Sequence, residues 1–318
     1  MAGQAPFFIV GAGRSGTTLL RLILIGHSHL HIPPETWFLR DLVREFPLSG
    51  ALTQPQAERA VETMVRHERW PDLGLDADRV RLGLAALPAG ADMRELLDLA
   101  YQRLLQASGK VRLGDKTPHY FEIVPELATL YPDAAFIYLV RDGRDVAMSW
   151  IDAGWQRYYE AGFEWPRAMA ALRRDRAAYP GRVLEVRYED LARAPVDTTQ
   201  AICDFLGEKF EPAMLDWHGR IEAVAARDRH LHGRLQQPLT ADAVALWRRR
   251  LSPAECFAME ACLRRELTAA GYELMFKARA WWPAFMATAG MLGLAAPLLR
   301  RAVPHLQKHN LLPRNMYF

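Results

Sequence analysis

Residues 6–18 read Pro6-Phe-Phe-Ile-Val-Gly11-Ala-Gly13-Arg14-Ser15-Gly16-Thr17-Thr18. The apolar run before Gly11 predicts a short buried strand, and the apolar spacing from Thr18 to Ile25 predicts a helix directly behind the glycines. Glycines let the backbone wrap closely around a ligand, and the amide groups at the start of the following helix then point at one anion. This stretch therefore predicts a strand, an anion-binding loop and a helix.

The loop has the Gly-x4-Gly spacing of a nucleotide phosphate loop, from Gly11 to Gly16. Thr17 stands where such loops carry a lysine, which disfavours an ordinary ATPase or kinase. Arg14 supplies a positive charge from inside the loop, and Thr17 and Thr18 add hydroxyl donors. The alternative is a plain glycine turn capped by hydroxyl side chains, and the strand and helix on either side argue against it.

The same order of strand, loop and helix recurs along the chain. Phe136–Val140 is a second apolar run, followed by the turn residues Arg-Asp-Gly and by a helix from Asp145. Val183–Tyr188 predicts a third strand, and 196–206 a further helix. Strands separated by helices predict an α/β fold with a parallel central sheet flanked by helices, and ligands beyond the carboxyl ends of the strands. We therefore expect a P-loop-like nucleotide-binding fold.

Two further segments are predicted to be helical. Residues 40–110 hold amphipathic stretches separated by Pro and Gly, the clearest at Met93–Ala107, and predict a helical insertion into the α/β fold. Ser252 and Glu255 form a capping box at the start of a helix that Gly271 ends.

The end of the chain is a separate electrostatic region. Residues 277–318 contain six Lys/Arg and no Asp or Glu, which gives +6, so the remainder sums to −3 of the net +3. The uncharged stretch 281–299 is rich in Ala, Gly and Pro, which favours packed or interfacial helices over a membrane span. We expect one domain over 1–276 and a basic, apolar C-terminal extension over 277–318. Peripheral membrane contact through 281–301 is the hypothesis that this composition supports.

The composition is that of a soluble globular protein. The chain has 318 residues, half of them hydrophobic and 24% charged, which excludes disordered, collagen-like and disulfide-scaffold classes. Three cysteines without CxxC spacing argue against a disulfide framework and against a cysteine-based zinc site. The apolar run at 7–10 is too short for a signal-peptide core. We expect a cytoplasmic protein, membrane-associated if its tail makes contact, and no nucleic-acid partner.

A second set of polar residues follows the strand predicted at 136–140. Arg141 stands at the strand end, where its guanidinium can fork onto a phosphate, and Ser149, two turns into the next helix, can add a hydrogen bond. This pair suits a terminal monoester phosphate. The alternative is a solvated turn in which Arg141 and Arg144 pair locally with Asp142 and Asp145.

Together the two motifs carry a family resemblance. Phe8-Ile-Val-Gly-Ala-Gly-Arg-Ser-Gly-Thr-Thr18 is similar to the 5′-phosphosulfate-binding loop of sulfotransferases that use 3′-phosphoadenosine 5′-phosphosulfate (PAPS). Tyr138-Leu-Val-Arg-Asp-Gly-Arg-Asp-Val-Ala-Met-Ser149 resembles their 3′-phosphate element. The Arg-Ser-Gly-Thr-Thr form resembles the tyrosylprotein and Golgi carbohydrate branch of the family. The resemblance implies PAPS as cosubstrate, bound by Gly13, Arg14, Ser15, Gly16, Thr17, Thr18, Arg141 and Ser149.

Two charged residues between the motifs are candidates for the chemistry. Sulfuryl transfer needs a base for the acceptor and positive groups, here Arg14 with a second cation, where charge grows on the leaving phosphate. Glu35 follows the first predicted helix beside the apolar Trp37, and its spacing from Arg14 resembles that of the glutamate base in tyrosylprotein sulfotransferases. Lys116 matches the family's Lys-x-Pro element, which implies that it neutralises the leaving oxygen. A loop carboxylate and a surface lysine are the alternatives, and His119 is the second candidate base.

Two later residues complete the predicted cofactor site. Tyr188, at the end of the third strand, resembles the family's adenine-side tyrosine, and Arg248 resembles basic residues that close over the cofactor in relatives. The alternatives are a core-edge tyrosine and a solvated arginine face. No His, Glu or Asp grouping shows metal-ligand spacing, and a sulfuryl group with one negative charge needs no magnesium clamp. We therefore expect no metal requirement.

These observations predict a sulfotransferase that moves the sulfuryl group of PAPS to a hydroxyl, or an amine, of an acceptor that the sequence does not identify. Two alternatives stay open. One is a P-loop nucleotide kinase-like enzyme, which the missing loop lysine opposes. The other is a non-catalytic nucleotide-binding or membrane-adaptor protein, which the combination of Arg14, Glu35 and Lys116 opposes. The oligomeric state is not predicted.

Overall fold

The computed structural model describes residues 4–88, 90–153, 158–236 and 239–276. Its centre is a five-stranded sheet in which each strand runs parallel to its neighbours, in the order β2-β3-β1-β4-β5. The strands are β1 (Phe7–Val10), β2 (Leu30–His31), β3 (Arg112–Lys116), β4 (Ala135–Val140) and β5 (Val183–Arg187). The predicted α/β fold with a parallel central sheet is confirmed.

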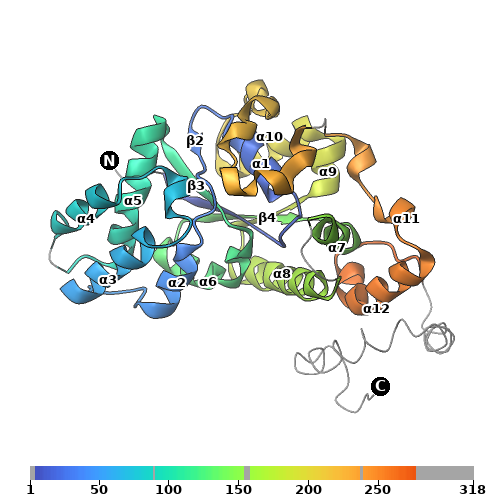
Figure 1. Cartoon of the computed structure of the whole chain (residues 1–318), viewed down its shortest axis with the longest axis horizontal. Helices are drawn as coiled ribbons and strands as arrows, with labels where there is room; N and C mark the ends of the chain where they lie inside the picture. Colours follow the sequence, from blue (N-terminus) through green and yellow to red (C-terminus); the bar gives the residue numbers. More distant parts are fainter. Residues whose placement is uncertain (1–3, 89, 154–157, 237–238, 277–318) are drawn as a thin grey trace, which may run out of the picture.

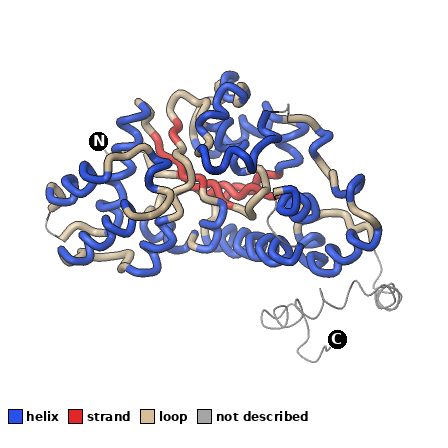
Figure 2. The backbone as a smooth tube through the Cα atoms, in the orientation of Figure 1, coloured by secondary structure: helices blue, strands red, loops and turns tan. Residues whose placement is uncertain are grey.

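Helices cover both faces of the sheet (Figure 1), and the strands form the layer between them (Figure 2). Helices α1, α9 and α10 lie on one face, and α6, α7, α8 and α12 lie on the other. The described α-helices are α1 (Thr17–Leu24), α2 (Phe38–Glu45), α3 (Gln54–Val65), α4 (Ala77–Ala85), α5 (Met93–Ser108), α6 (Val124–Leu130), α7 (Gly143–Asp152), α8 (Tyr158–Ala178), α9 (Tyr188–Arg193), α10 (Pro195–Leu206), α11 (Trp247–Arg250) and α12 (Pro253–Ala269). The described 3₁₀ segments are η1 (Trp70–Leu73), η2 (Pro118–Glu122), η3 (Pro212–Leu215), η4 (His218–Ala223), η5 (Ala226–Gln236) and η6 (Ala241–Ala243).

Strand β1 lies at the centre because its side chains are apolar on both faces. Phe7 and Ile9 pack into the core under α1, α9 and α10, whereas Phe8 and Val10 pack into the core of the opposite face. All four are completely buried. A strand buried on both sides needs a continuous apolar run rather than an alternating one, which is what residues 7–10 provide.

The predicted helix ends coincide with local capping groups. Helix α12 begins with the capping box of Ser252 and Glu255, and Gly271, with φ of +74°, follows its last turn. Helix α5 begins with a second capping box, made by Asp92 and Glu95. The helix predicted at 93–107 is thereby confirmed, one residue longer.

Strand β3 does not follow from its sequence. Arg112-Leu-Gly-Asp-Lys116 carries three charged residues, yet every one of the five is buried. The interior accepts them because each is paired: Arg112 donates to the Ala5 carbonyl at 3.0 Å, and Asp115 accepts from Thr36 at 2.7 Å. The alternative of a surface lysine does not hold, because Lys116 is the buried last residue of a strand.

Helices α2 to α5 and η1 all lie between β2 and β3 in the chain, beside the sheet (Figure 1). No helix within the described residues is long and apolar enough to cross a membrane. The extension predicted at 277–318, including the stretch 281–301, lies outside the described residues. All three cysteines are free thiols.

Candidate active site

The sequence-predicted residues gather at the carboxyl edge of the sheet, although they come from distant parts of the chain. The glycine loop, 11–16, follows β1, and Lys116 is the last residue of β3. Arg141 and Tyr188 directly follow β4 and β5, and Glu35 comes four residues after β2. Because parallel strands end at the same edge, this topology brings five chain segments to one place.

The glycine loop passes so close to its neighbours that two positions exclude a side chain. Gly11 has φ of +147°, and a Cβ there would lie 2.5 Å from the Leu139 carbonyl oxygen of β4. Gly16 has φ of +103°, and a Cβ there would lie 2.6 Å from the Tyr188 ring. Glycine is required at both positions, because the conformation and the close approach each exclude larger residues.

We expect Gly16→Ala to lower the free energy of unfolding by about 2–3 kcal/mol, because the strained backbone and the displaced Tyr188 ring each cost energy. Denaturant unfolding of the variant measures the loss. Gly109→Ala is the matched control: its φ is +67°, and no described atom lies within 4 Å of the added Cβ. The control should lose only the backbone contribution, about 1 kcal/mol. Equal losses in the two variants would contradict a close packing of the loop on Tyr188.

A cavity of about 860 Å³ opens above the glycine loop. Its walls combine the loop, the two segments after β4 and β5, and a cover to which residues within 230–235 and 239–246 contribute. Seven of the predicted cofactor residues line it: Arg14, Gly16, Thr17, Thr18, Arg141, Ser149 and Tyr188. The two sequence motifs therefore face one cavity rather than two separate surfaces.

Arg141 is a buried cation at the wall of this cavity. Its Nη1 donates to the Arg14 carbonyl at 3.4 Å, and its guanidinium lies 4.4 Å from the centroid of the Tyr188 ring. Asp145, 3.9 Å away, is its nearest described carboxylate. Arg141 Nε is buried and has no hydrogen-bond partner within the described part of the chain, and the same holds for Ser15 Oγ in the loop. An unsatisfied donor at the cavity wall, such as Arg141 Nε, indicates a place for an anionic ligand.

Arg14 connects the loop to the cavity's far wall and to its cover. Its Nε donates to Ser149 Oγ at 3.3 Å, and its Nη2 donates to the Leu231 carbonyl of η5 at 2.6 Å. The backbone of Arg14 adopts φ of +69°, a conformation that non-glycine residues rarely accept. Trp37, beside Glu35, has φ of +53°. Strain of this kind concentrates at functional sites.

Glu35 and Lys116 form an ion pair at one side of the loop. Lys116 Nζ donates to Glu35 Oε1 at 2.5 Å and to Thr18 Oγ1 at 3.2 Å, and the Trp37 indole donates to Glu35 Oε2 at 2.8 Å. The Lys116 side chain is only 4% exposed. Burial favours a raised pKa for Glu35, but the charge and hydrogen bond of Lys116, with that of Trp37, outweigh it and lower the pKa. Burial lowers the pKa of Lys116 despite its partner.

Two residues of the site escaped the sequence analysis. His232 of η5 faces the start of α1, with its Nε2 3.5 Å from Thr18 Oγ1. Burial, then the charges of Arg14 and Lys116, lower the pKa of His232 to about 4, so the ring is neutral near pH 7. Glu164 of α8 is buried, and its Oε1 accepts from the Gly13 amide at 2.5 Å. Neither residue stands in a recognisable motif, so only the fold reveals them.

Glu164 also binds the second candidate base. Glu164 Oε2 lies 3.1 Å from His119 Nε2, and the His119 ring lies 4.8 Å from that of Trp37. Burial favours a lowered pKa for His119, but the hydrogen bond and charge of Glu164 raise it. His119 is therefore held beside the glycine loop and near Glu35, with its ring nitrogen committed to a carboxylate.

Arg248 does not join the described lining of the cavity. Its guanidinium stacks on Trp247 at 4.5 Å and lies 3.5 Å from Glu273. Gly13 and Ser15 belong to the glycine loop, but they too are absent from the described lining of the cavity.

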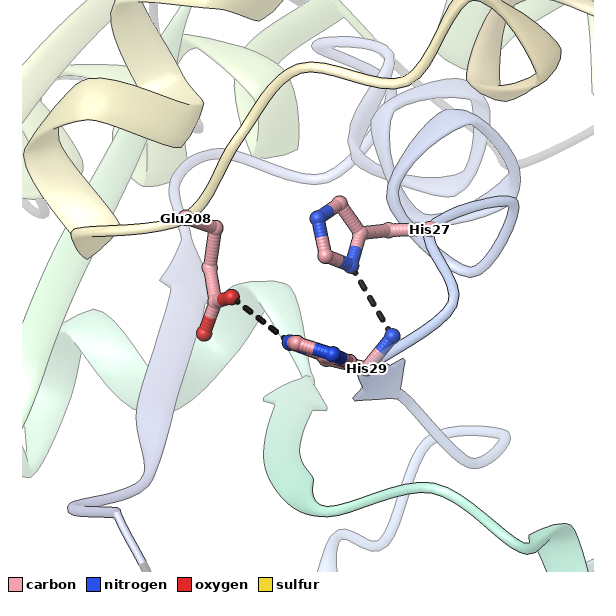
Figure 3. Close-up of side chains that lie close together, drawn as sticks. All are labelled: His27, His29 and Glu208. Atoms are coloured by element: carbon pink, nitrogen blue, oxygen red, sulfur yellow. Dashed lines mark hydrogen bonds and ion pairs between the residues drawn. The ribbon is translucent and has the colours of Figure 1, made fainter.

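One group of side chains within the described residues has the composition of a metal site, His27, His29 and Glu208, whose ligand atoms lie within 4.8 Å of one another (Figure 3). His29 precedes β2, so the group lies at the amino edge of the sheet, away from the glycine loop. His27 already accepts the His29 amide at Nδ1 and contacts the Lys209 carbonyl at Nε2, both at 2.9 Å. Glu208 pairs with Arg112 at 3.5 Å. The arrangement is satisfied as a hydrogen-bonded network and plays no part in the cavity.

Comparison with known proteins identifies relatives of this architecture. The model of the sulfotransferase family matches residues 6–212. Protein-tyrosine sulfotransferase 1 of Danio rerio is 27% identical over 215 residues, covering 65% of this chain and 54% of the relative. The nodulation protein NoeE of Sinorhizobium fredii is 32% identical over 148 residues, covering 45% of this chain and 30% of the relative. The chain spans less than a third of the length of relatives such as NoeE.

A solved structure shows the same fold. The sulfotransferase domain of the olefin synthase from Synechococcus PCC 7002 superposes with a TM-score of 0.62 at 25% identity, covering 86% of this chain and 97% of that domain. The matched part of the chain therefore corresponds to nearly the whole of that domain.

Proposed function

The chain belongs to the sulfotransferase family, and from this premise we propose that it transfers the sulfuryl group of PAPS to a hydroxyl, or an amine, of an acceptor. One observation carries the proposal. The glycine loop and the Arg141–Ser149 motif, which are separated by more than a hundred residues, line the same cavity of about 860 Å³. A nucleotide with an anion at each end needs two anion sites at one cavity, which an ordinary single phosphate loop does not provide.

In this proposal the loop binds the 5′-phosphosulfate. The hydroxyls of Thr17 and Thr18 and the amides at the start of α1 donate to it, and Arg14 adds a positive charge. Arg141 and Ser149 bind the 3′-phosphate, and Tyr188 contacts the adenine side. Tyr188 lies against both Gly16 and the Arg141 guanidinium. This position supports a further role for Tyr188, which is to hold in place the guanidinium that binds the 3′-phosphate.

Glu35 then acts on the acceptor, and Lys116 acts on the leaving group. Glu35 accepts the proton of the acceptor, the acceptor oxygen or nitrogen forms a bond to sulfur, and the bond between sulfur and the 5′-phosphate oxygen breaks. The electron pair stays on that oxygen, where Lys116 and Arg14 neutralise the charge. The contacts of Lys116 with both Glu35 and Thr18 at the start of α1 support this role.

The proposal is tested by incubating the full chain with PAPS labelled in its sulfur and with a lysate of its native cell, and then identifying what acquires the label. Label transfer that requires PAPS supports it. Turnover of ATP with magnesium, and none of PAPS, would instead favour the kinase-like alternative. Nucleotide binding with transfer to no acceptor would favour the non-catalytic alternative.

Removal of divalent metals should leave sulfuryl transfer unchanged. The sulfuryl group carries a single negative charge in PAPS, and in the proposal Arg14 and Lys116 neutralise the charge that develops on the leaving oxygen, so the chemistry needs no metal clamp. The measurement is the rate of transfer before and after dialysis against EDTA. A loss of rate that added magnesium or zinc restores would contradict this expectation.

A further inference from the structure

Lys116 serves two parts of the site with one ammonium group. Its Nζ contacts Glu35 Oε1 at 2.5 Å and Thr18 Oγ1 at 3.2 Å. Thr18 lines the cavity, whereas Glu35 does not. Lys116 therefore stands between the proposed base and the proposed donor pocket, and its burial leaves water little access to it.

In this arrangement the base is masked. Glu35 receives a charged hydrogen bond at one oxygen and the hydrogen bond of the Trp37 indole at the other, so each oxygen already accepts one donor before any substrate arrives. A carboxylate bound in this way is a poor proton acceptor, because each donor stabilises its ionised form. Glu35 therefore becomes a stronger base when Lys116, its charged partner, leaves.

We infer that the nucleotide itself unmasks the base: its 5′-phosphate oxygens, bound at Thr18, take Lys116 away from Glu35, which then accepts the proton of the acceptor. The inference rests on the proposed function. An ammonium carries three donors on a flexible stem, so a small rotation transfers it from a carboxylate to a phosphate. The same movement brings the positive charge to the oxygen that sulfur leaves.

The consequence is that the competence of the base depends on the nucleotide. Glu35 becomes competent only while the nucleotide's 5′-phosphate holds Lys116. Once the transfer is complete and the nucleotide leaves, Lys116 returns to Glu35 and the base is masked again.

The direction of the proton linkage follows from the surroundings of Glu35. Without nucleotide, Lys116 keeps the pKa of Glu35 below its ordinary value. When Lys116 leaves, burial and the neighbouring Asp115 carboxylate both favour the protonated form, and the pKa rises. Nucleotide binding therefore draws a proton onto Glu35 at mildly acidic pH, between the two pKa values, and draws none well above both. The other charged groups coupled to Glu35 are Arg21 on α1, Arg69 before η1, His119 on η2 and His232 on η5.

The test is calorimetric titration of the full chain with 3′-phosphoadenosine 5′-phosphate, in buffers of different ionisation enthalpy. The dependence of the observed heat on the buffer gives the number of protons taken up. We expect the wild type to take up more protons than Glu35→Gln at mildly acidic pH, and the same number near pH 8. Subtracting the variant removes the contribution of the nucleotide's own phosphates, and the difference that remains comes from Glu35 and the groups coupled to it.

A second variant keeps the test decisive. In Lys116→Met, Glu35 has no cation to lose when the nucleotide binds. This variant and the double variant Lys116→Met/Glu35→Gln should therefore take up the same number of protons. Equal uptake by the wild type and Glu35→Gln at both pH values would overturn the inference while leaving the proposed function intact. Failure of the folded wild type to bind the nucleotide would overturn the proposed function itself.

Discussion

Glu35→Gln should lower the turnover number of sulfuryl transfer about 10²- to 10⁴-fold, which is the usual contribution of a general base. The amide keeps the shape of the side chain and can still accept hydrogen bonds from Lys116 and Trp37, but it cannot accept a proton. Nucleotide binding should persist, because Glu35 does not line the cavity. Steady-state rates with saturating PAPS, together with calorimetric binding of 3′-phosphoadenosine 5′-phosphate, separate the two effects.

Glu122→Gln is the matched control for this substitution. Glu122 is a partly buried glutamate of the neighbouring η2, paired with Arg40, Arg44 and Arg167 away from the loop. Its loss should leave turnover unchanged. Full turnover by Glu35→Gln would remove Glu35 from the role of base and direct attention to His119, which Glu164 holds beside the loop.

The parts of the fold that were predicted from sequence are those in which local pattern and tertiary role agree. Residues 7–10 and 136–140 are apolar on every side, and they are central strands buried on both faces. The sequence after Ser252 contains, in order, the helix cap, a proline in the first turn and a glycine after the last turn. Such elements can be predicted from their own sequence, without knowing which segments pack against them.

The elements that were not predicted depend on distant partners. Strand β3 is buried although it carries Arg112, Asp115 and Lys116, and the carbonyl, hydroxyl and carboxylate groups that satisfy these charges come from elsewhere in the chain. Helix α8 continues through Pro166, where sequence alone favours a break.

The candidate site divides along the same line. The glycine loop and the Arg141 motif were visible in the sequence because each is a short segment with its own local pattern. The contact between Glu35 and Lys116 joins residues 81 positions apart, and it turns two separate candidates into one coupled pair. His232 and Glu164 were missed because a single histidine or glutamate in a polar helix is usually solvated. Only the packing of η5 and α8 against the loop gives them a place.

Arg141→Ala should weaken the binding of 3′-phosphoadenosine 5′-phosphate about 100-fold, or about 3 kcal/mol, since it removes a bidentate cation from a monoester phosphate. The binding of adenosine 5′-phosphate, which lacks the 3′-phosphate, should change far less. The reason is the position of the guanidinium: it is buried at the cavity wall, with an unsatisfied Nε, and it is supported by the Tyr188 ring. Titration of both nucleotides into the wild type and the variant measures the difference directly.

Arg187→Ala is the matched control, because Arg187 ends β5 opposite Val140 at the end of β4, yet it donates to the Ala270 carbonyl and is absent from the described lining of the cavity. Removal of the Arg187 side chain should change the binding of neither nucleotide. If Arg141→Ala weakened the binding of both nucleotides equally, the 3′-phosphate would not be the group that Arg141 binds. The loss would instead indicate that the cavity wall formed by Arg141 and Arg14 had collapsed. A selective loss would fix the orientation of the nucleotide, with its sulfuryl end at the glycine loop and facing Glu35 and Lys116.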